Sequence, residues 1–328
     1  MRDIVADNAE VSLLTREQSN AVKGLLIALV VLGHNKYVMQ GGMSNVYLYS
    51  FHVYAFYYLP FLYDFRKMAW GGFFRKNLVR LYVPYTVFFL LVCGVAFTQH
   101  HLPDLGTAIW TYICGSQYSL SRSFGFGSFL WFLPTMLSVL TYRQIYYRLG
   151  ITGRSLMLVL SGVCLCGFAY MWGWYVTLWW KSPFCLAVGL SMLLPAVCLR
   201  AVCRHVSPKT LVFLFFLLTV AILIFYPVRL EYNLTFLTIN RLMCPVLIFS
   251  LLLTLREYLA QSRIAVDLGV QSLVIYLTHQ FIYNGCYAGT LRFIPHPGIY
   301  EGLLMFVVAL GGGYLISLFK PIRYVFPK

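Results

Sequence analysis

Long apolar runs separated by short polar segments repeat along the whole chain. A run of about 20 apolar residues lets a helix cross the ~30 Å hydrocarbon core of a bilayer. The apolar residues are continuous rather than alternating, which argues against an outer-membrane barrel. The pattern predicts an all-α fold: a polytopic membrane helical bundle of about ten transmembrane helices. The predicted spans are 20–39, 46–63, 80–98, 127–147, 155–172, 176–198, 210–227, 236–255, 266–288 and 299–319.

Composition agrees with this pattern. Of the 328 residues, 60% are hydrophobic and 11% are charged, whereas a soluble globular domain carries about 25% charged residues. The net charge of +15 is explained by basic residues held in cytoplasmic loops and against anionic headgroups. We therefore expect the lipid bilayer as a partner and no nucleic acid. The nine cysteines lack metal-ligand spacing and predict neither a metal site nor a redox role.

The basic residues also orient the predicted spans. Most of the 25 Lys and Arg residues fall on the side that holds the N-terminus, which the positive-inside rule makes the cytoplasm. The prediction is a cytoplasmic tail over 1–19, a transmembrane domain over 20–319 and a short cytoplasmic tail over 320–328. Both termini are then cytoplasmic. The longest predicted loop, 99–126, contains the apolar segment TAIWTYI, which we expect to lie along the membrane surface.

Two ionisable residues lie within the first predicted span. Lys23 and His34 are eleven residues apart, which is about three helical turns and about 16 Å along a helix axis. Both side chains therefore share one helix face, with Lys23 near the cytoplasmic boundary and His34 toward the outer half of the bilayer. An ionisable residue within a membrane helix is a functional-site hypothesis by default.

Two further histidines are expected at the same depth as His34. His52 lies in the second predicted span, and His279 lies in the ninth. One interpretation is an outward-facing cavity lined by three histidines. The other is three core histidines, each satisfied by a backbone carbonyl or a tyrosine. The depth alone leaves both interpretations open for His52 and His279, while the Lys23 partner favours a functional role for His34.

A basic stretch precedes the third predicted span. The segment GGFFRKNLVRLYVPY, expected as a cytoplasmic loop, carries Arg75, Lys76 and Arg80. The positive-inside signal explains these charges without any other role, and it is the favoured interpretation. Arg and Lys around a helix entrance are also how a phosphate-bearing ligand would be held.

Acidic residues are confined to the N-terminal tail, loops and predicted helix ends. Cation-coupled transporters often keep a carboxylate near the midplane, so this distribution weakens that class. It also excludes a paired-carboxylate glycosidase site within the membrane. Histidine remains the best candidate for a general base.

Five segments in order resemble the motifs of the membrane-bound acyltransferase-3 family. The spacing Lys23-x10-His34 is similar to the family's R/K-x10-H signature. SFHVYAFYYLPF, FFRKNLVRLYVPY, FLWFLPTML and GVQSLVIYLTHQF resemble later motifs of the family. Two departures occur: Leu59 and Pro60 stand where the family has Ser-Gly, and Arg75-Lys76 stands where an arginine pair is commoner.

The resemblance implies a multi-pass enzyme of the cell membrane, the inner membrane in a bacterium, that modifies polysaccharides of the cell envelope. It would transfer an acyl group, most often acetyl, from cytoplasmic acyl-CoA to a hydroxyl of a sugar or glycan. Acyl-CoA (acetyl-CoA) is then a co-substrate, and no cofactor is bound permanently. An alternative is a transporter or flippase for a glycan or a lipid-linked precursor, and a purely structural scaffold explains the aligned ionisable residues least.

The resemblance also suggests roles for single residues. His34 and Lys23 would be the catalytic residues, with His34 acting as general base or carrying the acyl group transiently as an acyl-imidazole. The CoA phosphates would be held by basic residues: Lys23, Arg75, Lys76 and Arg80. The acceptor or the thioester would be positioned by three ring-bearing residues: His52, Trp131 and His279.

Overall fold

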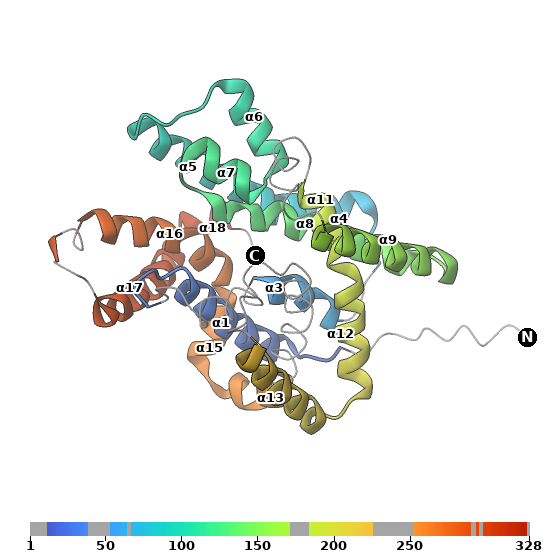
Figure 1. The fold of residues 1–328 in the computed structure, drawn as a ribbon. Coiled ribbons are helices and arrows are strands. Elements are labelled where there is room, and N and C mark those ends of the chain that lie inside the picture. Colours follow the sequence, from blue (N-terminus) through green and yellow to red (C-terminus); the bar gives the residue numbers. More distant parts are fainter. Residues whose placement is uncertain are drawn as a thin grey trace, which may run out of the picture.

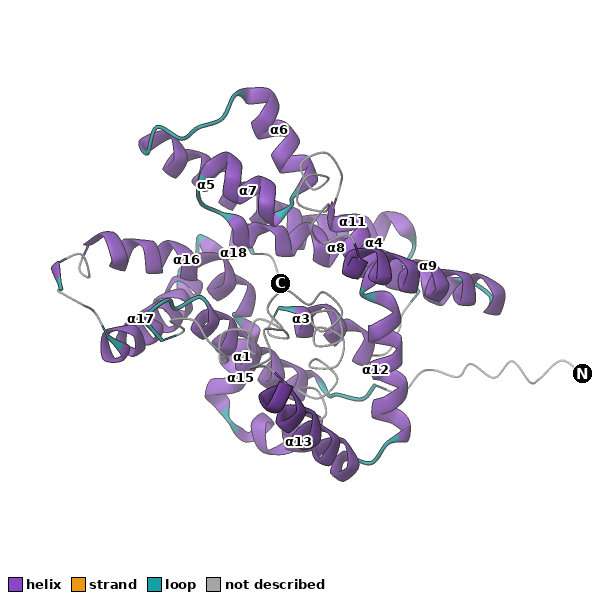
Figure 2. Ribbon diagram, viewed as in Figure 1, coloured by secondary structure: helices purple, strands orange, loops and turns teal. Residues whose placement is uncertain are grey.

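The computed structural model describes residues 12–38, 53–63, 67–170, 184–225, 252–289, 293–294 and 298–326. Every regular element within these ranges is a helix, as Figures 1 and 2 show. The all-α prediction is confirmed for this part of the chain. The elements in order are α1 Arg16–Gly33, α3 Tyr54–Tyr58, η1 Leu59–Leu62, α4 Trp70–Asn77, η2 Leu78–Tyr82, α5 Val83–Thr98, α6 Leu105–Cys114, α7 Gln117–Phe124, η3 Ser128–Trp131, α8 Phe132–Arg148, α9 Ile151–Tyr170, α11 Phe184–Ser191, α12 Leu193–His205, α13 Pro208–Phe225, a helix over 252–261, α15 Arg263–Val270, α16 Ser272–Gly289, α17 Ile299–Leu318 and α18 Ile322–Val325.

Within the described ranges, three helices are long and apolar enough to cross a membrane. They are Trp70–Thr98, Cys185–His205 and Ile299–Leu318. The helices Leu105–Cys114 and Ile151–Gly167 are apolar but shorter. A membrane protein follows from these helices, while the count of ten spans and the cytoplasmic position of both termini stay predictions.

The first helix is held by its two ends. Thr15 caps the N-terminus of α1: its hydroxyl accepts from the Gln18 amide, and its own amide donates to the Gln18 side chain. This reciprocal pair satisfies two amides that would otherwise lack partners. The helix ends at Gly33, where Asn35 accepts from the Tyr37 and Val38 amides at 3.1 and 3.2 Å. The expectation that His34 lies inside the helix is therefore wrong, because this turn makes His34 the C-cap residue.

The basic stretch before the third span is helical, not a loop as expected. Arg75 and Lys76 lie on α4, and Arg80 lies on the wide π-helical turn η2. The cause is Pro84 at the start of α5, whose ring would clash with the carbonyl of residue 80 in a regular α-helix. A π turn accommodates such a residue within one continuous helix.

Two other predicted boundaries differ from the structure. The predicted loop 99–126 contains α6, capped by Asp104, and α7, capped by Ser116. Both residues are good N-caps because a side-chain oxygen accepts a hydrogen bond from a backbone N–H of the first turn that has no partner within the helix. The predicted span 266–288 is divided at Gln271 into α15 and α16.

The helix α1 packs against α15, α16, α17 and α3, and these helices lie together in Figure 1. Glycines allow the contact between α1 and α15. A Cβ at Gly24 would overlap the Ala265 carbonyl oxygen, and one at Gly269 would overlap the Asn20 carbonyl oxygen. A second group forms around α8, which contacts α11, η2, η3 and α9. The cavity described next lies where α1 and the helix containing α4 and η2 face each other.

Candidate active site

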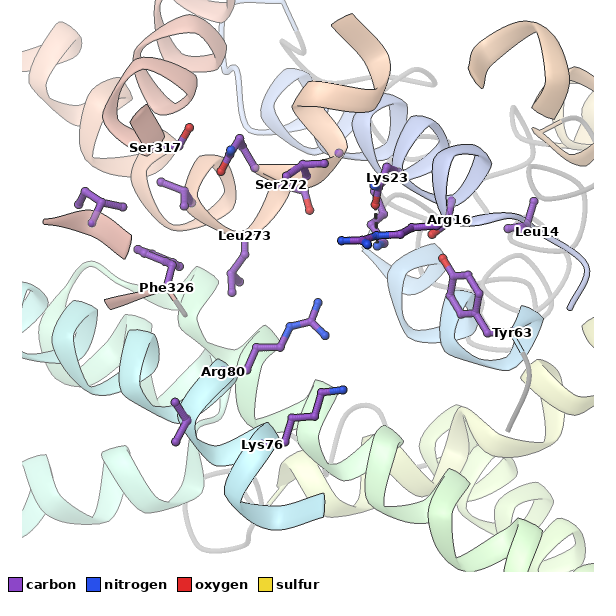
Figure 3. A pocket seen from close by; sticks show the side chains of 18 of the residues that line it. Leu14, Arg16, Lys23, Tyr63, Lys76, Arg80, Ser272, Leu273, Ser317 and Phe326 are labelled. Carbon is purple, nitrogen blue, oxygen red and sulfur yellow. Dashed lines mark hydrogen bonds between the residues drawn. The ribbon is translucent and has the colours of Figure 1, made fainter. Parts of the chain in front are cut away.

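A cavity of about 1060 Å³ opens between α1 and the α4–η2 helix. Figure 3 shows Arg16 and Lys23 on one side and Lys76 and Arg80 on the other. The start of α16 supplies Ser272 and neighbouring residues, and the end of α17 and α18 closes a further side. This volume is slightly above the range of about 300–1,000 Å³ that is typical of small-molecule and cofactor sites.

The cavity is strongly positive. Five basic side chains line it, and no acidic residue is among its described lining residues. The five are Arg16, Lys23, Arg75, Lys76 and Arg80. The Lys23 ammonium donates to the Asn20 side chain at 3.3 Å, and this acceptor is neutral, so none of the described lining residues supplies a negative charge to balance it. Convergent Arg and Lys side chains of this kind hold anions, phosphates above all.

The spacing on α4 and η2 places two of these charges, Lys76 and Arg80, on one helix face. Lys76 and Arg80 are four residues apart, and Gly72 precedes Lys76 by four. Residues four apart lie one above the other on a helix, so all three line the cavity. The structure thus brings Lys23, Arg75, Lys76 and Arg80 to one cavity. Their role in holding a CoA phosphate stays a prediction.

A pair of histidines lies at the other end of α1. The ring centroids of His34 and His279 are 5.0 Å apart, although the two residues come from α1 and α16. The His279 ring is fully buried, whereas His34 is partly exposed. His52, the third histidine of the sequence hypothesis, lies outside the described residues.

Both imidazole rings are held in one tautomer. His34 Nδ1 lies 2.8 Å from the Val30 carbonyl oxygen, and His279 Nδ1 lies 2.5 Å from the Tyr276 carbonyl oxygen. A carbonyl only accepts, so each Nδ1 carries the hydrogen and each neutral Nε2 keeps its lone pair. Nε2 of His34 is therefore the atom that can take a proton or attack a carbonyl.

Buried hydrogen bonds fix the segments around the histidine pair. The Tyr283 hydroxyl donates to the Val31 carbonyl at 2.8 Å and ties α16 to α1. The Tyr276 hydroxyl donates to the Phe129 carbonyl at 2.6 Å and ties α16 to η3. The Asn35 side-chain amide donates to the Gly302 carbonyl at 2.5 Å and ties the end of α1 to α17. The geometry of the pair is thus set by three neighbouring elements.

Trp131 lies on η3, the element that also carries Phe129. Its ring contacts that of Tyr57 at 5.9 Å between centroids. Its neighbour Phe129 approaches His279 at 6.2 Å, and Phe132 approaches Tyr276 at 4.8 Å. Trp131 therefore packs in the same aromatic cluster as Tyr57 and Phe132, and its role in positioning a substrate stays a prediction.

The cavity and the histidine pair are separated along α1. His34 is not among the residues that line the cavity, and it is eleven residues, or about 16 Å, from Lys23. The side chains between them on the same face are fully buried: Leu26, Ile27, Val30 and Val31. A ligand that reaches both ends must therefore displace some of these side chains or their neighbours.

Arg16 and Tyr63 are among the cavity residues that sequence reasoning missed. Arg16 precedes Lys23 by seven residues, a spacing that returns to the same helix face, so this signal was present in the sequence. Tyr63 also lines the cavity, but its position depends on contacts with distant helices and left no local signal.

The fold and the cavity define a helical membrane protein with an anion-attracting cavity at one end of α1 and a histidine pair at the other. A family model described as an acyltransferase domain matches residues 16–318, so the chain belongs to the acyltransferase-3 family. The chain matches no curated protein and no solved structure. Membership of this family supports an O-acyltransferase type of function.

Proposed function

We propose that this protein transfers an acyl group, acetyl in the first instance, from cytoplasmic acyl-CoA to a hydroxyl of a sugar or cell-surface glycan. The observation that carries the proposal is the arrangement along α1. Five basic residues and no described acidic residue line the cavity at its N-terminal end. His34, whose Nδ1 donates to the Val30 carbonyl, lies at its C-terminal end.

The donor end follows from charge. Coenzyme A carries a pyrophosphate and a 3′-phosphate, and these groups match a cavity lined by Arg75, Lys76, Arg80 and Lys23. Arg binds phosphate through two parallel hydrogen bonds, and Lys acts as a point charge. The acyl-pantetheine arm would run along α1 toward His34. Because Leu26, Ile27, Val30 and Val31 are buried, donor binding requires their surroundings to open.

The chemistry is assigned to His34 Nε2. As a general base, Nε2 removes the proton of the acceptor hydroxyl while the hydroxyl oxygen attacks the thioester carbonyl. The carbon–sulfur bond then breaks, and the CoA thiolate takes the proton from the imidazolium. The Val30 carbonyl, which accepts from Nδ1 at 2.8 Å, holds the ring in the required tautomer.

A second route through the same atom is acyl-carrier catalysis. Nε2 attacks the thioester carbonyl, CoA leaves as thiolate, and the acceptor hydroxyl attacks the acyl-imidazole, its proton passing to the thiolate. The two routes are separated by incubation with labelled acetyl-CoA alone. A burst of CoA with label retained on His34 supports the carrier, and no burst supports the base.

The acceptor is tested in cells. Mass spectrometry of cell-surface glycans would compare cells that contain the protein, cells that lack it and cells that contain His34→Ala. We expect acetyl groups on a glycan only in the first. Identical glycans in all three, together with glycan translocation by the purified protein in vesicles, would favour a transporter over an acyltransferase.

A further inference from the structure

One end of the cavity is formed by residues that the proposed phosphate contacts do not use. They include Ser12, Leu14, Arg16, Ser19 and Tyr63, and Figure 3 shows Leu14, Arg16 and Tyr63 on one side of the cavity. Arg16 is seven residues before Lys23 on α1 and lies about 10 Å farther from His34 along the helix. Figure 3 shows Tyr63 on the side of the cavity where Arg16 and Lys23 lie.

This end of the cavity is built firmly. The Leu13 amide donates to the Leu62 carbonyl at 3.0 Å and holds the entry to α1 against the end of η1. The Tyr63 carbonyl accepts from Arg143 of α8 at 3.1 Å and from Arg200 of α12 at 2.9 Å. The backbone of Tyr63 is thus fixed by two charged donors from different helices, and charge-assisted hydrogen bonds are the stronger kind.

Two hydroxyls at this end lack an internal partner. The Ser19 Oγ and the Tyr63 hydroxyl oxygen are buried, and neither has a hydrogen-bond partner in the part of the chain that the structure describes. Ser19 is only 2% exposed. Buried hydroxyls are nearly always hydrogen-bonded, and one without a partner destabilises the fold. A ligand with several acceptor oxygens would satisfy both.

The chemistry of this ligand follows from the three groups together. A guanidinium takes two oxygens of a phosphate in its planar fork. A terminal phosphate presents three strong acceptor oxygens, which leaves oxygen lone pairs for two hydroxyl donors. Arg16 and Tyr63 lie across the cavity from Lys76 and Arg80 of the facing helix, so the cavity fits a ligand with a second anionic centre.

We propose that Arg16, Ser19 and Tyr63 form a subsite for a phosphomonoester, the 3′-phosphate of coenzyme A. The pyrophosphate then lies nearer Lys23, from which the pantetheine arm leads toward His34. The subsite makes the enzyme discriminate CoA thioesters from donors that carry only the pyrophosphate or only pantetheine. This inference rests on the proposed acyl-CoA donor.

The test compares binding of CoA and 3′-dephospho-CoA to the purified full-length protein in detergent, by isothermal titration. The wild type should bind CoA at least about tenfold more tightly than 3′-dephospho-CoA, since hydrogen bonds to a charged group contribute about 1.5–3 kcal/mol. Tyr63→Phe, Ser19→Ala and Arg16→Ala should each reduce this preference, with Arg16→Ala reducing it most. Adenosine 3′,5′-bisphosphate should compete with CoA, and adenosine 5′-monophosphate should compete more weakly.

Two matched control variants change residues outside the cavity. Tyr258→Phe and Arg263→Ala remove a hydroxyl and a charge from exposed positions outside the cavity, and they should keep the preference for CoA. Tyr63→Phe keeps the ring, so it tests the hydroxyl even if Arg16→Ala fails to fold.

Two results would overturn the subsite and leave the donor intact: equal binding of CoA and dephospho-CoA by the wild type, or an unchanged preference in all three variants. A folded wild type that binds neither would overturn the proposed function and the subsite with it.

Discussion

At the scale of single residues, the orientation of His34 comes from its place at the end of a helix. As the C-cap of α1 it can turn Nδ1 back to the Val30 carbonyl. The sequence predicts the face and depth of His34 from the spacing to Lys23, and it places His279 at similar depth. It does not predict the tautomer or the 5.0 Å separation of the rings, because both depend on how α16 packs against α1.

Asn35 holds the turn after His34, and its replacement should lower the stability of the fold around the site. Asn35→Ala would leave the Tyr37 and Val38 amides and the Gly302 carbonyl without their present partner. We expect a loss of about 2 kcal/mol or more in the free energy of unfolding, because buried polar groups would lose hydrogen bonds. Thermal unfolding in detergent measures this loss. Asn284→Ala, at an exposed position of α16, is the control, and equal melting of the two variants would contradict the prediction.

The basic residues of the α4–η2 helix should act on donor binding rather than on chemistry. Lys76→Ala and Arg80→Ala should each raise the KM for acyl-CoA about tenfold and change kcat much less. The reason is that a phosphate contact is equally strong in the ground state and the transition state. Steady-state kinetics with purified protein measures both constants. Lys209→Ala, an exposed lysine of α13 outside the cavity, should match the wild type, whereas a fall in kcat at constant KM would refute the assignment.

At the scale of elements, the helix Trp70–Thr98 explains how the charges come to face α1. Its 29 residues span about 44 Å, more than the ~30 Å hydrocarbon core. The apolar part Val83–Thr98 can lie in the core, which leaves α4 and η2 at the headgroup level. The sequence predicts the apolar part correctly but treats the basic part as a loop. The reason is that Pro84 suggests a helix boundary, whereas the π turn before it keeps the helix continuous.

The contact between α1 and α15 should depend on two glycines. Gly24→Ala should destabilise the protein by about 1–3 kcal/mol, since its Cβ would overlap the Ala265 carbonyl and force the helices apart. Gly311→Ala in α17 is the matched control: a Cβ there meets no atom within 4 Å, and Ala favours a helix by about 1 kcal/mol over Gly. Unfolding temperatures in detergent compare them. A Gly24→Ala protein as stable as the control would contradict the close packing.

Contacts between distant elements limit what the sequence predicts of the cavity. Arg16 could be found from its seven-residue spacing to Lys23. Tyr63 could not, because its place depends on Arg143 and Arg200, which come from helices 80 and 137 residues farther along the chain. Side chains fixed by such contacts carry no periodic signal.

At the scale of the whole molecule, the proposed reaction requires one side of the membrane for the donor and the other for the acceptor. The distribution of Lys and Arg along the sequence predicts which side is the cytoplasmic, donor side. Three described helices have the length and composition of membrane spans. Hydropathy succeeds here because a backbone in lipid must form helices. It misplaces helix breaks such as Gln271, where local turns and not apolar content decide.

The predicted topology can be tested at two turns. With the N-terminus in the cytoplasm, the segment at Asp104 lies outside and the one at Gly150 lies inside. Epitope tags inserted after these residues should be accessible in intact cells only at Asp104. Accessibility of both tags, or of the Gly150 tag alone, would contradict the ten-span arrangement.

The most direct test of the account is acetyl transfer by His34→Ala. Purified wild-type protein and the variant would be supplied with acetyl-CoA and a glycan-bearing membrane fraction, and CoA release and acetyl incorporation would be measured. His205→Ala, an exposed histidine of α12, is the control and should match the wild type.

We predict that His34→Ala lowers the rate by at least about 100-fold, the usual contribution of a general base, while CoA binding and the unfolding temperature stay unchanged. Transfer by His34→Ala at the wild-type rate would contradict the account, as would a folded wild type that binds CoA and transfers no acetyl group.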